Sequence, residues 1–339
     1  MAGTVTLADS IHNLSPFLIR FSDDFGIRWY GLSYVLAFVA GYYLLRFLIR
    51  RGYSEMAEDQ LVDFITFCAS FGVTLGGRLG YMLLYSPREF FANPLIFFNF
   101  LGGGMASHGG IAGLALFTLY FAKRHGYHWR QIGDNLCVVA PTGIAIVRCA
   151  NFINGELWGN ITTKEATPWA MKFPSELQEI PIDSEEYRDL IDAATAVDPN
   201  AGTPDAIIEL SRENDLLRET IGNFLHYRHP SQIYQALLEG LALFALLFAI
   251  RLKWRRLPYG VLTALFFIGY ATFRILGEQF RHPDAGNFPG TDLSKGQFYS
   301  LFMYAVGAAF LAYALYERKF KSPLDPSRLD AEIGGRMHR

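Results

Sequence analysis

The stretch Arg148-Cys-Ala-Asn-Phe-Ile-Asn-Gly-Glu-Leu-Trp-Gly159 places charged and amide side chains directly after an apolar run. That run extends from Cys137 to Val147. A charged side chain at the centre of a bilayer costs about 2.5 to 3.5 kcal/mol even on lenient scales. A surface loop, in turn, would not need the apolar residues that alternate with the polar ones. The combination predicts a site where a membrane helix meets water.

The composition agrees with a membrane protein. Of the 339 residues 51% are hydrophobic and only 18% charged, with a mean hydropathy of +0.17. A soluble domain carries about a quarter charged residues. The net charge of −2 argues against a nucleic-acid partner. Three cysteines, Cys68, Cys137 and Cys149, lie in apolar runs without the spacing of a disulfide framework or a zinc site.

Apolar stretches of about 20 residues, the length that spans a bilayer as a helix, recur along the chain. We expect seven spans, near 30–49, 61–84, 105–122, 131–150, 232–250, 258–277 and 296–316. The predicted fold class is therefore an all-α integral membrane protein. Basic residues follow the first, third, fifth and seventh spans. The positive-inside rule then predicts an outer amino terminus and a cytoplasmic carboxyl terminus.

The long segment 160–229 interrupts the spans and is rich in Asp and Glu. It is too long for a bare connector, and we expect a small extracytoplasmic cap with a helix from Pro204 to about Leu225. The predicted organisation is a membrane domain over 1–159, the cap over 160–229, a membrane domain over 230–321 and a cytoplasmic tail over 322–339.

Polar side chains gather at the outer ends of five spans. They are Tyr30, Arg78, His108, Arg148, Asn151, Asn154, Glu156, Tyr270, Arg274, Glu278 and Arg281, together with Gly159. Each has an ordinary structural interpretation as well: an arginine can reach to headgroups, a tyrosine can belong to an aromatic belt, and asparagines can hold helices together. Arg274 and Glu278 could form an i,i+4 ion pair. Convergence from several spans nevertheless favours one shared site.

Arginines without a surplus of neighbouring carboxylates suit an anion that is held by two N–H groups, phosphate above all. At headgroup depth the simplest source of that phosphate is a phospholipid. The sequence contains neither a Gly-x-Ser-x-Gly elbow nor Asp, His or Cys at metal-ligand spacing. The residues alone therefore predict a metal-free membrane enzyme, or a binding protein, that acts on an anionic lipid. They leave its second substrate open.

Several motifs in chain order resemble the signature of the bacterial prolipoprotein diacylglyceryl transferases. They are Arg28-Trp-Tyr-Gly-Leu32, Gly76-Gly-Arg-Leu-Gly-Tyr81, His108-Gly-Gly110, the stretch 148–159, His229-Pro-Ser-Gln-Ile-Tyr234 and Arg274-Ile-Leu-Gly-Glu-Gln-Phe-Arg-His-Pro-Asp284. One position departs from the family's pattern, because Val147 stands where a glycine usually precedes the arginine. The departure removes no reactive group.

The resemblance implies that the enzyme transfers the sn-1,2-diacylglyceryl group of phosphatidylglycerol to the lipobox cysteine of a preprolipoprotein. A thioether forms and glycerol 1-phosphate leaves, at the outer face of the bacterial cytoplasmic membrane. The implied catalytic residues are Arg148, Arg274, His108, Glu156 and Glu278. The implied headgroup residues are Arg148, Asn151, Asn154, Gly159, Tyr30, Tyr270, Arg274, Arg281 and Arg78. No metal or cofactor is expected.

On the roles of these residues the physical chemistry leaves alternatives. His108 is the natural general base for the substrate thiol, but a guanidinium such as Arg148 would also lower the pKa of that thiol. Glu156 and Glu278 are expected to fix the two arginines. Three other functions stay open: a lipid or anion transporter, a lipid receptor without catalysis, and a metal-dependent headgroup transferase. A transporter should however show an internal repeat, and none is evident.

Overall fold

The computed structural model describes residues 10–22, 25–99, 104–282 and 295–320. The side chains of a few helical residues, His108 among them, are outside the described part. The predicted cytoplasmic tail over 322–339 also lies outside the described residues, as do Pro283 and Asp284 of the last motif.

In the described part of the chain, six helical segments are long and apolar enough to cross a membrane. They are α1 (Trp29–Arg50), Glu58–Leu84, α6 (Trp129–Asn154), Ser231–Lys253, α12 (Val261–Glu278) and Ser300–Glu317 within α13 (Lys295–Phe320). Glu58–Leu84 is made of η2 (Glu58–Gln60), α2 (Leu61–Phe67), the π-helical η3 (Cys68–Leu75) and α3 (Gly76–Leu84). Ser231–Lys253 is made of α10 (Ser231–Gln235), the π-helical η8 (Ala236–Ala242) and α11 (Leu243–Lys253). The predicted fold class, an all-α integral membrane protein, is confirmed.

The third expected span, 105–122, forms helix α5 (Ser107–His125), which is not among the six apolar segments. Its 19 residues include three glycines near the start and the basic run Lys123-Arg124-His125 at the end, so its hydropathy is diluted. The number of spans and their orientation remain predictions.

Contacts divide the chain into two compact units. The first contains 1–37, 141–243 and 269–302, and the second contains 38–140, 244–268 and 303–339. Helices α1 and α6 contribute residues to both units. The predicted domain boundaries separate membrane-spanning parts from the cap and the tail, and they do not correspond to units defined by contacts. These boundaries stay predictions.

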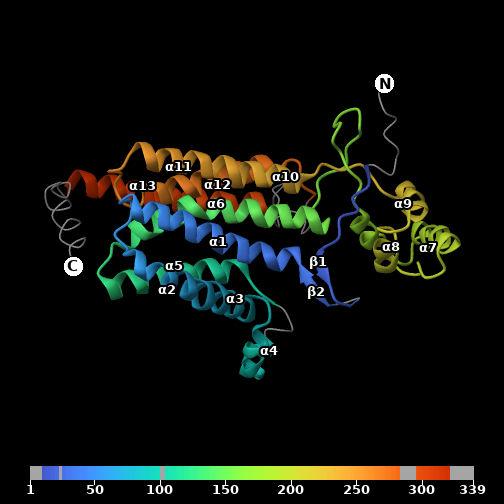
Figure 1. Cartoon of the computed structure of the whole chain (residues 1–339), viewed down its shortest axis with the longest axis horizontal. Helices are drawn as coiled ribbons and strands as arrows, with labels where there is room; N and C mark the ends of the chain where they lie inside the picture. The colour runs from blue at the N-terminus through green and yellow to red at the C-terminus, as the bar shows by residue number, and fades with distance from the viewer. Residues whose placement is uncertain (1–9, 23–24, 100–103, 283–294, 321–339) are drawn as a thin grey trace. The chain divides into compact units, whose positions relative to one another are not determined.

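In the first unit, the inserted segment has a hydrophobic core of its own. Helices α7 (Glu185–Val197), α8 (Pro204–Leu210) and α9 (Asp215–Ile221) lie together (Figure 1). The fully buried residues of this core include Leu177, Leu190, Ile207, Leu217 and Ile221. The short helices η6 (Pro174–Glu179) and η7 (Gly222–Phe224) complete the segment.

The expected helix from Pro204 to Leu225 is broken in two. Asn214 ends the first part because its side chain accepts a hydrogen bond from the Leu217 N–H at 3.1 Å and caps α9. The same unit contains a short hairpin that the sequence did not predict, with β1 (Phe17–Arg20) antiparallel to β2 (Gly26–Arg28). The hairpin leads directly into α1.

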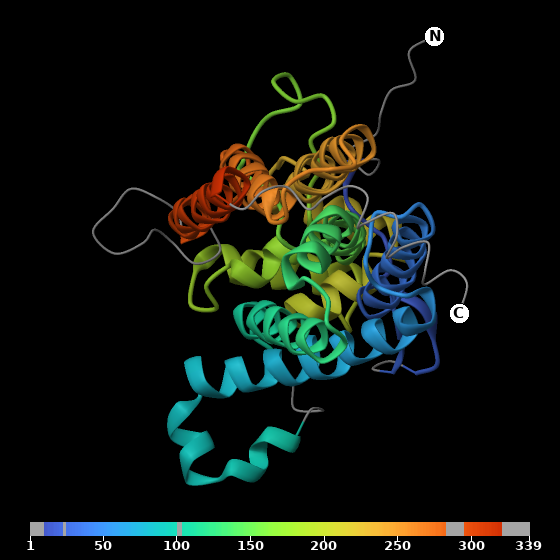
Figure 2. The same cartoon turned by 90° about the vertical axis from the view of Figure 1, so that its left-hand side faces the viewer.

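In the second unit, glycines allow α5 to lie against the segment formed by η3 and α3 (Figures 1 and 2). A Cβ atom on Gly113 would lie 2.1 Å from the Gly72 carbonyl oxygen, and one on Gly80 would lie 2.5 Å from Gly109 Cα. Such small-residue ridges bring membrane helices into backbone contact. Two shorter helices, α4 (Pro87–Ala92) and η4 (Pro94–Phe98), connect α3 to α5.

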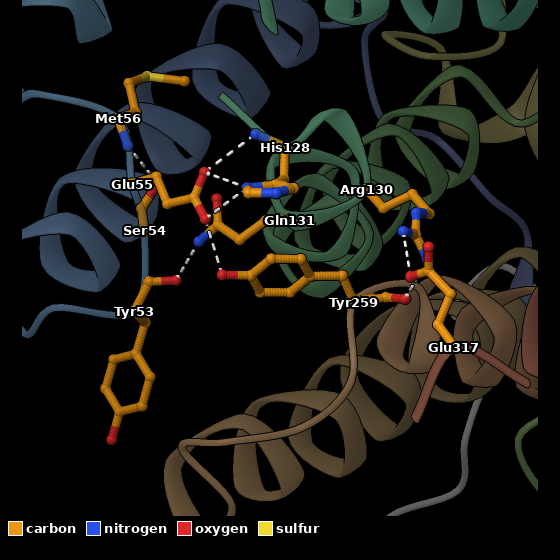
Figure 3. Close-up of polar contacts among 9 residues, drawn as sticks. All are labelled: Tyr53, Ser54, Glu55, Met56, His128, Arg130, Gln131, Tyr259 and Glu317. Carbon is orange, nitrogen blue, oxygen red and sulfur yellow. Dashed lines mark hydrogen bonds and ion pairs between the residues drawn. The ribbon is translucent and has the colours of Figure 1, made fainter. Parts of the chain in front are cut away.

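Polar contacts in the second unit join the loop after α1, the start of α6 and the loop before α12 (Figure 3). The Glu55 carboxylate accepts hydrogen bonds from the backbone N–H of His128 at 2.9 Å and from the Tyr259 hydroxyl at 2.7 Å. Arg130 on α6 pairs with Glu317 on α13 at 2.5 Å. These contacts fix helix ends to one another within this unit.

Candidate active site

Three charged residues of the first unit meet at one point. Glu239, in the π-helical segment η8, is fully buried. One of its carboxylate oxygens lies 3.4 Å from an Nη of Arg148 on α6, and the other lies 3.3 Å from an Nη of Arg274 on α12. A single carboxylate therefore holds two guanidinium groups from two other helices.

Gly240 brings two of these helices close enough for the contact. A Cβ atom on Gly240 would lie 2.5 Å from the Cβ of Ala145, so η8 approaches α6 next to Arg148. On α12, a Cβ atom on Gly277 would lie 3.8 Å from a carboxylate oxygen of Glu239, an ordinary contact that does not require glycine. The π-helical turn that carries Glu239 is a type of irregularity common at functional sites.

Arg148 is held loosely. Its single hydrogen bond or ion pair among the described residues is the 3.4 Å contact with Glu239, longer than the 2.7 to 2.9 Å of a tight charge-assisted bond. A guanidinium has five N–H donors. The remaining donors of Arg148, whose side chain is 15% exposed, are therefore placed to bind an anion.

The predicted face of α12 is present in the structure. Arg274 forms an i,i+4 ion pair with Glu278 at 3.1 Å. Tyr270, one turn earlier, interacts with Glu239 and with both arginines. Tyr270, Arg274 and Glu278 thus point to the same cluster, as the spacing of four residues requires.

Glu156 has different partners from those expected. Its carboxylate accepts hydrogen bonds from the side-chain amides of Asn151 at 2.7 Å and Asn154 at 3.2 Å. It is thus Glu239, not Glu156, that contacts Arg148. Tyr34 on α1 interacts electrostatically with Glu156, and its hydroxyl lies 3.0 Å from that of Tyr30. Tyr30 is thereby connected to the carboxylate through one intervening tyrosine.

The turn that carries Glu156 has an unusual backbone. Gly155 has φ +70° and Leu157 has φ +59°, which L-residues other than glycine, Asn and Asp rarely adopt. Two fully buried side chains fix it: Ser231 donates to the Leu157 carbonyl at 2.9 Å, and Gln232 donates to the Glu156 carbonyl at 2.6 Å. The His-Pro-Ser-Gln motif therefore shapes the turn that carries the site.

Gly159 is enclosed by two other chain segments. Its N–H donates to the His229 carbonyl at 2.9 Å, and it forms an antiparallel bridge with Arg281. A Cβ atom at Gly159 would lie 2.3 Å from the Phe280 carbonyl oxygen. Only glycine fits there, and the bridge places Arg281 beside it.

A second buried arginine supports this region from the cap. Arg228 donates to the Gly159 carbonyl at 3.2 Å and to Glu176 at 2.6 Å, and its guanidinium lies 3.8 Å from the centre of the Trp158 ring. Burial would raise the pKa of the Glu176 carboxyl, but hydrogen bonds from Arg228 and His226 outweigh it and lower this pKa. Glu176 therefore stays ionised and holds Arg228.

Two predicted site residues belong to the second unit. Arg78 is buried, and its guanidinium donates to the carbonyls of Ile96, Phe97, Asn99 and Gly104 at 2.7 to 3.1 Å. This arrangement holds the end of η4 and Gly104 to α3. His108 is the second residue of α5, and its side chain is outside the described part.

Sequence reasoning missed Glu239 and Gln235, and it quoted Gln232 only as part of the His229–Tyr234 motif, without a role in the site. Gln232, Gln235 and Glu239 are all fully buried, and they form a polar stripe inside an apolar span. The signal was available, because an ionisable residue within a membrane span indicates a functional site by default.

A sequence model of the family described as prolipoprotein diacylglyceryl transferase matches residues 16–313. The chain belongs to this family. Proteins named phosphatidylglycerol--prolipoprotein diacylglyceryl transferase are similar to it over nearly their whole length. The one from Bdellovibrio bacteriovorus is 35% identical over 92% of this chain and 96% of its own. The one from Burkholderia cenocepacia is 37% identical over 91% of this chain and 96% of its own. The one from Pectobacterium carotovorum is 38% identical over 86% of this chain and 91% of its own.

The geometry suits a member of this family. Two guanidinium groups lie near the ends of membrane helices and share one buried carboxylate, so the fold brings them together before any substrate arrives. Preorganised donors of this kind stabilise charge that develops in a transition state. The amides of Asn151 and Asn154 bind the Glu156 carboxylate, and the Tyr30 hydroxyl lies beside that of Tyr34.

Proposed function

We propose that this protein transfers the sn-1,2-diacylglyceryl group of phosphatidylglycerol to the lipobox cysteine of preprolipoproteins. The product is a thioether, and glycerol 1-phosphate is released, as the first step of bacterial lipoprotein maturation. The names of its relatives support both substrates. We place the reaction in the bacterial cytoplasmic (inner) membrane, with the site toward the extracytoplasmic face, in agreement with the positive-inside orientation.

The observation that carries the proposal is the loosely held guanidinium of Arg148 beside Arg274. In the reaction the substrate sulfur bonds to the glycerol carbon, and the bond from that carbon to the phosphate oxygen breaks. The oxygen keeps the electron pair, so negative charge grows on the leaving phosphate. Arg148 and Arg274 hold that phosphate and stabilise its charge.

The surrounding groups bind the phosphatidylglycerol headgroup and position the two arginines. Glu239 and Glu278 orient the guanidinium groups, and Glu156 orients the amides of Asn151 and Asn154. Headgroup contacts are assigned to Asn151, Asn154, Tyr30, Tyr270, Gly159 and Arg281. We give Arg78 a positioning role instead, because four backbone carbonyls occupy its guanidinium.

The substrate thiol must lose its proton, because the thiolate is the nucleophile. His108 is the proposed general base, and Arg148 is the competing means of favouring the thiolate. A His108→Gln variant distinguishes them, because raised pH would restore activity if the base were only needed to form thiolate. Strong activity of this variant at neutral pH would exclude His108 as the sole base.

The test uses purified protein, phosphatidylglycerol vesicles and a synthetic lipobox peptide, with mass spectrometry of the peptide. We expect a diacylglyceryl mass gain on cysteine that EDTA does not prevent. Arg148→Ala and Arg274→Ala should lose it while remaining folded, whereas the exposed Arg188→Ala in the cap should retain it. Wild-type activity in either site variant would refute the assignment.

The same assay separates the other functions. A lipid receptor would bind phosphatidylglycerol without modifying the peptide, and a transporter would move lipid between leaflets without a mass gain. A metal-dependent transferase would stop on addition of EDTA.

A further inference from the structure

A cavity of about 270 Å³ lies in the second unit, between the start of α2 and the end of α5. It is lined by Gln60, Asp63, Phe67, Phe117, Tyr120, Phe121, Arg124 and His125. None of these residues belongs to the proposed transferase site. The cavity is far too large for a single water molecule and offers room for a lipid headgroup.

One side of the cavity is aromatic. The ring of Phe117 lies 6.2 Å from that of Phe67, 6.1 Å from that of Tyr120 and 6.3 Å from that of Phe121. Phe67 and Tyr120 are also 44% and 62% exposed on the outer surface of their helices. A continuous apolar wall that runs from the cavity along two membrane helices suits an acyl chain.

The rim carries two opposite charges that the protein does not pair. Asp63 and Arg124 are both exposed, and within the described ranges neither the carboxylate nor the guanidinium has a hydrogen bond or ion pair. Their neighbours are engaged: Tyr127 donates to Gln60 at 2.8 Å, and the His125 ring contacts the Phe121 carbonyl at 2.9 Å. A ligand with one anionic and one cationic group would satisfy both charges.

The position of the cavity specifies where that ligand comes from. Asp63 is in the first turn of α2, near the start of the span Glu58–Leu84, and Arg124 is in the last turn of α5. The basic run Lys123-Arg124-His125 places this end toward the cytoplasm. The cavity is therefore at headgroup depth in the cytoplasmic leaflet.

We propose that this cavity binds a zwitterionic aminophospholipid of the cytoplasmic leaflet. Its phosphate is held by Arg124, its ammonium by Asp63, and an acyl chain lies along the aromatic wall. An anionic lipid such as phosphatidylglycerol would supply the phosphate but would leave Asp63 without a cation and repel it. The charges of the cavity thus favour the zwitterionic lipid over phosphatidylglycerol, the lipid substrate of the proposed transferase reaction.

The test is native mass spectrometry of the purified full chain with equal amounts of phosphatidylethanolamine and phosphatidylglycerol. Wild type should retain phosphatidylethanolamine in preference. Arg124→Gln should lower its retention about tenfold, the effect of losing one charge-assisted hydrogen bond. Asp63→Asn should keep lipid binding but lose the preference, and Lys123→Gln, an exposed neighbour outside the lining, should behave as wild type.

Two results would overturn the proposal. One is equal retention of the two lipids by wild type, and the other is a loss in Lys123→Gln as large as that in Arg124→Gln, which would indicate general attraction to the basic run. The melting temperature of each variant checks that it is folded. The lipid preference is measured without any transferase substrate peptide, so its failure and that of the proposed reaction are separate results.

Discussion

Glu239 is fully buried between the guanidinium groups of Arg148 and Arg274, so its charge decides where both lie. Removal of one partner of a buried ion pair leaves an uncompensated charge, which costs about 3 to 5 kcal/mol. The arginines would then move apart, and a displacement of about 1 Å can lower a rate about 100-fold.

We therefore expect Glu239→Gln to lower kcat for peptide modification by about 100-fold. The exposed Glu219→Gln in the cap is the matched control and should keep full activity. The rate is measured per folded protein, with the melting temperature as the check on folding. A Glu239→Gln enzyme with near-normal kcat would show that the shared carboxylate is not needed to position the arginines.

His12 makes the first unit sensitive to acid. Its side chain is 6% exposed and packs against Phe152 and Phe173 at ring distances of 5.4 and 5.5 Å. Burial lowers the pKa of His12 to about 4, from an ordinary value of 6.5. The folded state thus favours the neutral ring. Its stabilising effect is complete above pH 6.5 and is lost progressively as the pH falls toward 4.

Between pH 7 and pH 5 this group should therefore lower the free energy of unfolding by about 2 kcal/mol. His12→Phe keeps an aromatic ring but cannot take up a proton, so its stability should fall less over the same range. The melting temperature of both proteins is measured as a function of pH. Between pH 7 and pH 8 the two melting curves against pH should run parallel. Equal acid sensitivity of both would contradict the role of His12.

At the scale of elements, the contact between α5 and the segment η3–α3 depends on glycine at defined positions. A Cβ atom on Gly113 would lie 2.1 Å from the Gly72 carbonyl oxygen, a separation that no real side chain tolerates. A Cβ atom on Gly110, in the same helix, would lie 3.5 Å from the Val73 carbonyl oxygen, an ordinary contact.

Gly113→Ala should therefore force the helices apart and destabilise the protein by about 1 to 3 kcal/mol. Gly110→Ala is the matched control and should have little effect on packing, since it adds the same methyl group to the same helix. Thermal unfolding in detergent measures both. A Gly110→Ala protein that melts as low as Gly113→Ala would contradict close approach as the cause, because alanine by itself favours the helix more than glycine does.

At the scale of the whole molecule, the features that the sequence predicts are those that depend on residues close together in the chain. The spans follow from apolar length, and the shared face of Tyr270, Arg274 and Glu278 follows from helical spacing. The contact between Glu239 and Arg148 was not predictable in this way, because it depends on how closely η8 approaches α6 at Gly240. The break at Asn214 was missed because its capping role competes with a helical pattern on both sides.

The contacts of α5 with the span Glu58–Leu84 indicate whether α5 crosses the membrane. It contacts the span Glu58–Leu84 near one end, where the Ala106 N–H donates to the Gly77 carbonyl at 2.9 Å. It contacts that span again near the other end, where the rings of Phe64 and Phe121 lie 4.8 Å apart. A helix that accompanies a span along this length must cross the same apolar layer, although its glycines lower its hydropathy. We therefore expect α5 to cross the membrane as well, which together with the six apolar segments makes seven spans.

Cysteine labelling on either side of α5 tests this topology. Arg88, in α4 before the helix, and Lys123, at its end, are both exposed. In a Cys149→Ser background, because Cys149 is exposed, Arg88→Cys should react with a membrane-impermeant maleimide in right-side-out vesicles. Lys123→Cys should react only in inverted vesicles, since a crossing helix puts its two ends on opposite sides. The background protein gives the baseline, and equal labelling of both positions from one side would mean that α5 does not cross and that the order of the later spans is inverted.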